Sequence, residues 1–332
     1  MSSFQAVVAR AGEGKSYRVA LESLTEEALP RRPGDVLIEV SHSSLNYKDA
    51  LAVTGRGRII RAFPMVCGID LAGTVVEPGD SSLKVGDPVV IAGQGLGELR
   101  WGGFSRFASV TPASVVRIPQ GLDALSAMQL GTAGYTAMLS VIALEGAGLK
   151  PSEKEIVVTG ATGGVGSIAV ILLARLGFKV AASTGRPENA ERLRALGATS
   201  ILSRGELETP PPAMGPERWA GAIDAVGGAT LAHLLAHTES FGAVAACGMA
   251  GGAEFHSSVF PFILRNVSLL GINSTQSPPA LAQRAWERLG ELTDVTQLAG
   301  LASTEPMSRI VELSEALLAN RLRGRIVIDV TR

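Results

Sequence analysis

The stretch Ile-Val-Val-Thr-Gly-Ala-Thr-Gly-Gly-Val-Gly at residues 156–166 decides the fold. Three β-branched residues lead into a glycine-rich turn, and the apolar segment SIAVILLARLGF at 167–178 follows it. A dinucleotide site needs this order of buried strand, tight turn and helix. The first glycine permits the turn, the second lets backbone approach a pyrophosphate, and the third lets the helix pack closely on the strand. The N-terminus of the helix then offers N–H groups and a positive dipole to the phosphates.

The next strand, KVAAS at 179–183, indicates which cofactor is bound. An NAD site carries Asp or Glu about 20 residues after the glycines, to accept from the ribose 2′-OH. This chain has Ser183, Thr184, Gly185 and Arg186 there instead. Two hydroxyls and a guanidinium can hold a 2′-phosphate, which predicts NADPH in preference to NADH. The alternative is a plain helix start, and both can hold because a cap and a phosphate use the same N–H groups.

Composition restricts the class of protein. The chain has 332 residues, 46% of them hydrophobic and 18% charged, which predicts a globular protein with room for two domains. The net charge of −1 gives no overall attraction to nucleic acid or to an anionic membrane. Residues 1–14 lack a signal-peptide pattern, and the apolar run at 167–174 is too short to span a membrane. Free cysteines Cys67 and Cys247, far apart, fit a cytoplasmic protein.

The cysteine and histidine residues argue against a metal site. The chain has no CxxC motif. His233 and His237 stand four residues apart, a spacing that could hold a metal on a helix. No third ligand lies near them in the sequence, so a helix face near the surface is the favoured interpretation.

Organisation along the chain changes twice. Residues 4–123 carry strand patterns with Gly, Pro and Asp turns, and strand–helix alternation then runs to about residue 271. That alternation predicts a doubly wound parallel sheet. Amphipathic helical segments follow, and the closing strand GRIVIDV at 324–330 is expected to pair back onto the first domain. The expected ligand cleft lies between the two domains.

Six strings stand out along the chain: SSLNYKDALAVTG (43–55), FPMVCGIDLAGTV (63–75), GTAGYTAM (131–138), VTGATGGVG (158–166), STGR (183–186) and PFILRNVSLLGINS (261–274). Taken together, they resemble the medium-chain dehydrogenase/reductase superfamily. Within it they are most similar to the zinc-free quinone-oxidoreductase-like branch and, in that branch, to the NADPH-dependent acryloyl-CoA reductases. The resemblance implies an α/β fold, with a Rossmann-type NADPH-binding domain at 124–271 and a β-rich GroES-like catalytic domain at 1–123 plus 272–332.

Zinc-dependent members of the superfamily differ from this chain at their metal ligands. They carry a ligand cysteine where this chain has 46–49, and Gly-His-Glu where it has Gly68, Ile69 and Asp70. They also have a four-cysteine lobe that is missing here. Zinc-assisted alcohol oxidation is therefore not expected, because no Lewis acid would bind the alkoxide.

The resemblance places Asn46 and Tyr47 beside the nicotinamide as candidate catalytic residues. Tyr47 could donate its phenolic proton or orient the cofactor, and Asn46 could donate from its amide. Alternatively Tyr47 only packs, and the proton comes from solvent or a ribose hydroxyl. Asp49 is expected to cap a helix or form an ion pair rather than to catalyse.

The matched strings imply further cofactor contacts. The pyrophosphate would meet backbone N–H groups, residues after a strand end would lie near the nicotinamide ribose, and others would flank the ring. Cys247 is not expected to be a nucleophile, because no base stands near it in the sequence. In chain order the remaining cofactor candidates are Thr162, Gly163, Gly164, Val165, Gly248, Met249, Ile263, Ser274 and Asn320.

The expected reaction is hydride addition to the β-carbon of a short α,β-unsaturated acyl-CoA such as acryloyl-CoA, with donors stabilising the thioester oxygen. Arg56 and Arg58 are candidates for the CoA phosphates, or else belong to a solvated loop. The alternatives are a quinone or enone reductase and a non-catalytic NADPH-binding protein. A homodimer is expected through a sheet edge at 242–248 or 266–273, with no nucleic-acid or membrane partner.

Overall fold

The computed structural model describes residues 3–14 and 16–332. The chain divides into a first unit, Met1–Thr132 with Ser274–Arg332, and a second unit, Ala133–Asn273. The sequence predicted the first boundary at residue 123, but the structure has it within the helix α2 (Ala124–Gly146). Gly131 interrupts this helix with φ 52° and ψ −157°, a conformation that favours glycine.

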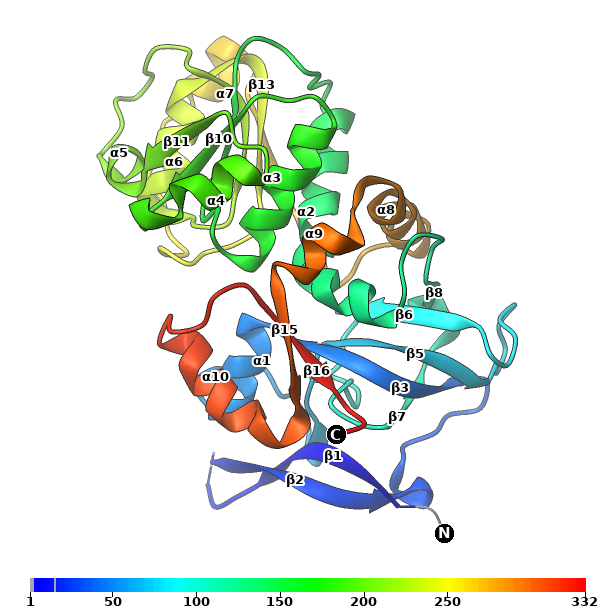
Figure 1. The fold of residues 1–332 in the computed structure, drawn as a ribbon. Coiled ribbons are helices and arrows are strands. Elements are labelled where there is room, and N and C mark those ends of the chain that lie inside the picture. Colours follow the sequence, from blue (N-terminus) through cyan, green and yellow to red (C-terminus); the bar gives the residue numbers. More distant parts are fainter. Residues whose placement is uncertain (1–2, 15) are drawn as a thin grey trace. The chain divides into compact units, whose positions relative to one another are not determined.

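The second unit is built on a parallel sheet of six strands in the order β11-β10-β9-β12-β13-β14. Numbered along this unit, the order is 3-2-1-4-5-6, which is the Rossmann order. The prediction of a doubly wound parallel sheet is confirmed. The strands are β9 (Ile156–Val158), β10 (Val180–Thr184), β11 (Ser200–Ser203), β12 (Trp219–Asp224), β13 (Thr238–Ala246) and β14 (Ser268–Gly271) (Figure 1).

Helices connect these strands, as parallel pairing requires. The first of them, α3, buries eight consecutive residues from Gly166 to Leu173, which explains why its sequence is apolar on every side. The connecting helices are α3 (Gly164–Arg175), α4 (Ala190–Ala195), α5 (Arg204–Glu208), α6 (Gly228–His237) and α7 (Phe260–Arg265), with a 3-10 turn at Pro187–Asn189.

Helix α2 is long and apolar enough to cross a membrane. Within the protein, 83% of its most apolar window is buried. The break at Gly131 further divides it into two shorter segments. We therefore interpret α2 as a core helix.

The first unit contains two sheets. One has the order β2-β1-β4, and the other has the order β15-β16-β3-β5-β6-β8 with β7 paired to β3. The strands are β1 (Ser3–Ala11), β2 (Tyr17–Thr25), β3 (Val36–Leu45), β4 (Met65–Val66), β5 (Asp70–Glu77), β6 (Pro88–Ala92), β7 (Phe107–Val110), β8 (Val116–Arg117), β15 (Ala302–Pro306) and β16 (Arg325–Asp329).

The C-terminal part of the chain completes this unit. Strand β16 pairs antiparallel with β3, placing Ile326 opposite Leu45, so the predicted return of the last strand is confirmed. Helices α1 (Tyr47–Thr54) and α10 (Ile310–Leu318) lie side by side (Figure 1). The remaining helices are α8 (Pro279–Leu292) and α9 (Val295–Ala299), with 3-10 turns at Glu26–Ala28, Pro112–Ser114 and Met307–Arg309.

Candidate active site

The glycine turn, residues 159–166, joins β9 to the start of α3 in the second unit. Gly160 has φ +56°, and the turn closes with a hydrogen bond of 2.8 Å from the Gly163 N–H to the Gly160 carbonyl. A Cβ on Gly166 would lie 2.3 Å from that same carbonyl oxygen, so only glycine fits. Helix geometry leaves the first N–H groups of α3, those of Gly164 and Val165, without intrahelical partners. The turn therefore has the shape and polarity that a pyrophosphate requires.

Asp224, the last residue of β12, fixes this turn from the neighbouring strand. Its carboxylate accepts from Thr159 Oγ1 at 2.6 Å and from the Gly227 N–H at 2.8 Å, and its carbonyl accepts from the Cys247 N–H at 2.8 Å. The side chain is fully buried, and burial raises its pKa while these bonds oppose the shift. Asp224 thus links three segments: its carboxylate joins those that follow β9 and β12, and its backbone carbonyl holds the one that follows β13. Asp224 was not expected at this site from the sequence, where its only signal is that of an acidic residue ending a buried strand before Gly227 and Gly228.

The end of β10 lies beside the glycine turn. The Ala161 N–H donates to the Ser183 carbonyl at 3.1 Å, and Thr184 Oγ1 accepts from the Arg186 N–H at 3.0 Å. Arg204, the first residue of α5, brings a second guanidinium to this place. A Cβ on Gly185 would lie 2.8 Å from Arg204 Cζ. Arg204 was not expected here from the sequence, because it stands on a different element, 18 residues after Arg186.

The end of β13 lies at the same edge of the sheet as the glycine turn and the end of β10. Gly248 approaches the Ala225 carbonyl so closely that a Cβ would lie 2.5 Å from its oxygen. Met249 and Ile263 expose 69% and 68% of their surface. Burial raises the pKa of the Cys247 thiol to about 12, which leaves it protonated at neutral pH and unsuited to act as a nucleophile.

In the first unit, the candidate catalytic residues stand where β3 passes into α1. Asn46 is the N-cap of α1, and its backbone N–H donates to Asp49 Oδ2 at 2.9 Å. Asp49 is thus the helix-capping residue that was expected, while Lys48 pairs with Glu98 at 2.7 Å. Tyr47 is 62% exposed.

The side chain of Asn46 faces inward. Its amide nitrogen donates to Asp70 Oδ2 at 2.8 Å and to Asp49 Oδ2 at 3.2 Å. Its amide oxygen accepts from Arg325 Nη1 at 3.0 Å. The polar atoms of Asn46 are therefore engaged inside the unit, and Tyr47 is the exposed member of the pair.

The other predicted residues of the first unit lie in exposed or loop positions. Arg56 follows α1 and pairs with Glu315 of α10 at 2.7 Å. Arg58 is exposed and forms no ion pair with the described residues. The carbonyl oxygen of Ser274 lies close to Gly93. A Cβ added to that glycine would be 3.0 Å from this oxygen. Asn320 ends α10 with a positive φ of 55°.

The donor set does not suit a metal. Within residues 3–14 and 16–332, no group of three or more His, Cys, Asp or Glu side chains is placed to hold an ion. His233 and His237 stack in parallel with ring centroids 4.2 Å apart, so their nitrogens do not converge. Ile69, where the resemblance implied a histidine in zinc-dependent members, has a hydrocarbon side chain that cannot ligate a metal.

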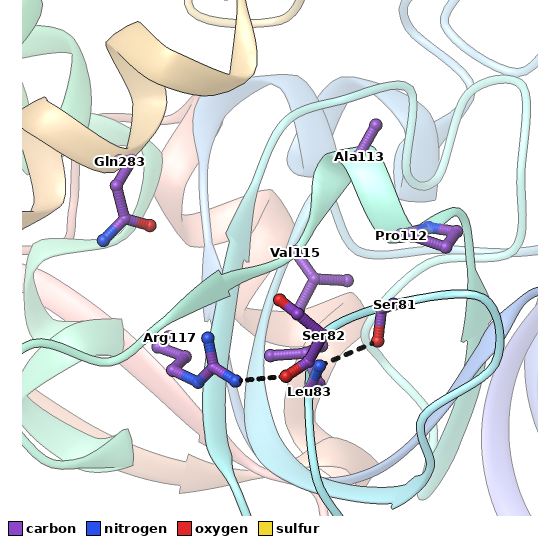
Figure 2. Close-up of a pocket in the computed structure, with 8 residues that line it drawn as sticks. All are labelled: Ser81, Ser82, Leu83, Pro112, Ala113, Val115, Arg117 and Gln283. Carbon is purple, nitrogen blue, oxygen red and sulfur yellow. Dashed lines mark hydrogen bonds between the residues drawn. The ribbon is translucent and has the colours of Figure 1, made fainter.

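A surface pocket of about 420 Å³ lies elsewhere in the first unit, between β8 and α8 (Figure 2). Arg117 lines it and donates to the Ser82 carbonyl at 2.7 Å, and Gln283 of α8 also lines it. None of the predicted site residues lines this pocket.

Comparison with known proteins finds matching families for both the β-rich first part of the chain and the part that begins at α3. Residues 32–120 match the family described as alcohol dehydrogenase GroES-like domain, and residues 164–291 match the one described as zinc-binding dehydrogenase. The chain is 46% identical over 326 residues, 98% of this chain and 99% of the relative, to the Escherichia coli K12 protein named probable acrylyl-CoA reductase AcuI. It is 42% identical over 319 residues, 94% of each chain, to the Bacillus subtilis putative quinone oxidoreductase YhfP.

The chain belongs to the medium-chain dehydrogenase/reductase superfamily. Its place there is the quinone-oxidoreductase-like branch, among the relatives named above. The crystal structure of E. coli K-12 YhdH with bound NADPH is similar to this chain, with a TM-score of 0.93 and 46% sequence identity. The match covers 98% of this chain and 100% of that one. The B. subtilis yhfP structure with NAD bound gives a TM-score of 0.94 at 40% identity, covering 99% and 100%.

Proposed function

We propose that this dehydrogenase/reductase reduces the C=C bond of a short α,β-unsaturated acyl-CoA with NADPH, converting acryloyl-CoA to propanoyl-CoA. The observation that carries the proposal is the end of β10, where the sequence Ser183 to Arg186 has two hydroxyls, an arginine and no carboxylate, and Arg204 lies close to Gly185. That end adjoins a complete glycine turn. The near full-length likeness to a probable acrylyl-CoA reductase supports the choice of acceptor.

The second unit fits NADPH. The glycine turn leaves room for a pyrophosphate, and Ser183, Thr184 and Arg186 suit a 2′-phosphate. Gly248 and Met249 at the end of β13, with Ile263, suit the nicotinamide half, since open α/β sheets bind ligands outside the carboxyl ends of their strands. When bound, NADPH supplies the hydride that reduces the alkene.

Tyr47 is the residue of the first unit that we assign to the reacting groups. As negative charge develops on the thioester oxygen, a phenolic O–H placed against it lowers the barrier, and such donors are worth about 100-fold in rate. Asn46 holds the start of α1 rather than donating to substrate, because its amide is engaged by Asp49 and Asp70. Ser274 and Asn320 complete the proposed surroundings of the nicotinamide.

We assign the CoA phosphates to Arg58 and Arg56. Arg58 is exposed in the segment after α1, whereas Arg56 must exchange Glu315 for a phosphate. Charge reversal at both positions should raise the KM for an acyl-CoA and leave the KM for a small enone unchanged. Equal increases for both acceptors would remove this assignment.

The acceptor is tested by stopped-flow measurement of NADPH oxidation with acryloyl-CoA, crotonyl-CoA and a quinone side by side. We expect the highest kcat/KM with acryloyl-CoA. Turnover with quinone alone would favour the second candidate, a quinone or enone reductase, which the likeness to YhfP supports. Absence of turnover with all three would favour a non-catalytic NADPH-binding protein.

We further propose that the enzyme works in the cytoplasm as a homodimer. Of the two sheet segments considered from sequence, 242–248 overlaps β13, which is paired on both sides. The other, 266–273, contains β14, the last strand of the sheet. Leu269 on this strand and Leu264 on α7 are exposed, which fits a surface covered by a second subunit.

A further inference from the structure

A buried polar network lies beneath α1 in the first unit, and the proposed reaction does not account for it. Its members come from the end of β3, from α1, from the start of β5, from α2 and from β16. Both acidic members expose 1% of their surface or less, and the arginine exposes 6%. The network consists of Ser44, Asn46, Asp49, Asp70, Thr132 and Arg325.

Arg325 is the cation of this network. Its Nη1 donates to Asn46 Oδ1 at 3.0 Å, its Nη2 to Ser44 Oγ at 2.9 Å and its Nε to the Gln129 carbonyl at 3.2 Å. All three nitrogens of the guanidinium are therefore used, in the planar fork that lysine cannot reproduce. Strand pairing places Arg325 there, because its neighbour Ile326 lies opposite Leu45 at the end of β3.

On the side of Asn46 away from Arg325, Asp70 accepts hydrogen bonds from several donors. Its carboxylate accepts from Ser44 Oγ at 2.5 Å, from Asn46 Nδ2 at 2.8 Å and from the backbone N–H of Thr132 at 2.8 Å. A Cβ on Gly131 would lie 2.5 Å from both Arg325 Nη2 and Ser44 Oγ, so the network fills the space against the break in α2. Asn46 is thus held from two sides by opposite charges.

We propose that Arg325 is a positioning residue for the reduction: by fixing the amide of Asn46 it fixes the N-terminus of α1, and with it Tyr47. This inference rests on the proposed function. Helix α1 has only eight residues, and helices that short are not stable by themselves. Tyr47 is mostly exposed, so its place depends on the backbone at the start of the helix. Misplacement of a reacting group by about 1 Å can cost 100-fold in rate.

The first test compares Arg325→Gln and Arg325→Lys with wild type. We expect kcat to fall about tenfold or more in both, because neither side chain restores the fork. The Kd for NADPH, measured by fluorescence, should stay within about twofold, because the nucleotide motif lies in the second unit. Arg10→Gln, which removes an exposed arginine paired with Glu22 in the same unit, is the matched control and should leave kcat unchanged.

A second variant separates positioning from folding. Arg325→Gln leaves Asp49 and Asp70 buried without a cation, so its Tm should drop. Asp70→Asn combined with Arg325→Gln removes one charge of each sign, and its Tm should rise again while kcat stays low. If kcat recovered together with Tm, the role of Arg325 would be structural only and the proposal would be wrong.

Hydrogen–deuterium exchange supplies a readout that does not depend on the acceptor. Backbone amides of residues 46–50 should exchange faster in Arg325→Gln and in the double variant than in wild type. Unchanged exchange there would overturn the positioning role even if acryloyl-CoA is a poor substrate. If wild type turns over only a quinone or an enone, the kcat comparison is made with that acceptor, so the proposed substrate can fail while the role of Arg325 stands.

Discussion

At the scale of single residues, the proposed preference for NADPH rests on Arg186 and Arg204, whose segments meet at Gly185. Removing either cation, as Arg186→Gln or Arg204→Gln, should weaken NADPH binding. A hydrogen bond to a charged group is worth about 1.5–3 kcal/mol, which corresponds to roughly 10- to 100-fold in KM. Binding of NADH, which lacks the 2′-phosphate, should change little. The measurement is the ratio of kcat/KM for NADPH to that for NADH.

Arg194→Gln is the control for this prediction, because Arg194 is an exposed arginine on α4. Its kcat/KM ratio should equal that of wild type. Equal losses with NADPH and NADH in Arg186→Gln would show that the arginine supports the fold of the turn and does not bind the phosphate.

The sequence predicted those site residues whose role can be inferred from their neighbours in the chain. Ser183 to Arg186 stand at the end of a strand, and the regularly spaced Gly160, Gly163 and Gly166 lie within seven residues, so their roles can be inferred from spacing. Asp224, Arg204 and Arg325 could not be found in this way. Each acts on a segment distant in sequence, and only strand order or register brings the partners together. The inward direction of Asn46 was missed for the same reason, because Arg325 comes from the far end of the chain.

At the scale of elements, the close packing of α3 on the glycine turn requires Gly166. In Gly166→Ala the added Cβ would meet backbone at 2.3 Å, so α3 must move away. Overpacking of this kind costs about 1–3 kcal/mol, and the displaced N–H groups should also bind pyrophosphate less well. We expect a lower Tm and a raised Kd for NADPH. Gly146→Ala, with nothing within 4 Å of the added Cβ, should do neither, and a raised Kd there would contradict the argument.

Element types followed from sequence patterns, whereas some boundaries did not. The segment TLAHLLAHTES at 230–240 has the pattern of a helix, but α6 ends at His237 and β13 begins at Thr238. Helix and strand meet there without a loop, so no glycine or proline marks the change. The break in α2 was missed because Gly131 lies in an apolar run that otherwise has helical spacing.

At the scale of the whole molecule, the proposed dimer depends on the edge of β14. Lysine side chains on edge strands oppose pairing with a second copy. Leu269→Lys should therefore convert the dimer to a monomer in size-exclusion chromatography with light scattering. Val85→Lys, at an exposed turn of the first unit, is the control and should keep the mass of wild type. A monomeric wild-type protein, or a dimeric Leu269→Lys, would place the interface elsewhere.

The stability of the molecule should also depend on pH through Asp49. Burial, and then the nearby Asp70, raise the pKa of Asp49 from its ordinary 3.8 to about 7. Between about pH 4 and 7 the folded state therefore holds a proton that the unfolded state has lost, so stability should fall as pH rises and level off above 7. Each pH unit in this window costs at most about 1.4 kcal/mol from this group.

Asp49→Asn removes this titration, because asparagine stays neutral at every pH. Its absolute stability should be lower, since the carboxylate accepts from the N–H groups of Asn46 and Ile69, but its stability should fall less between pH 5 and 7. Part of the slope should remain, because burial also raises the pKa of Asp224. Urea unfolding at pH 5, 6, 7 and 8 gives both curves.

Asp87→Asn is the control, since a hydrogen bond from Lys84 lowers the pKa of Asp87 and keeps its titration below this window. Parallel curves for wild type and Asp49→Asn would mean that Asp49 is already ionised throughout, and that Arg325 balances both carboxylates at neutral pH.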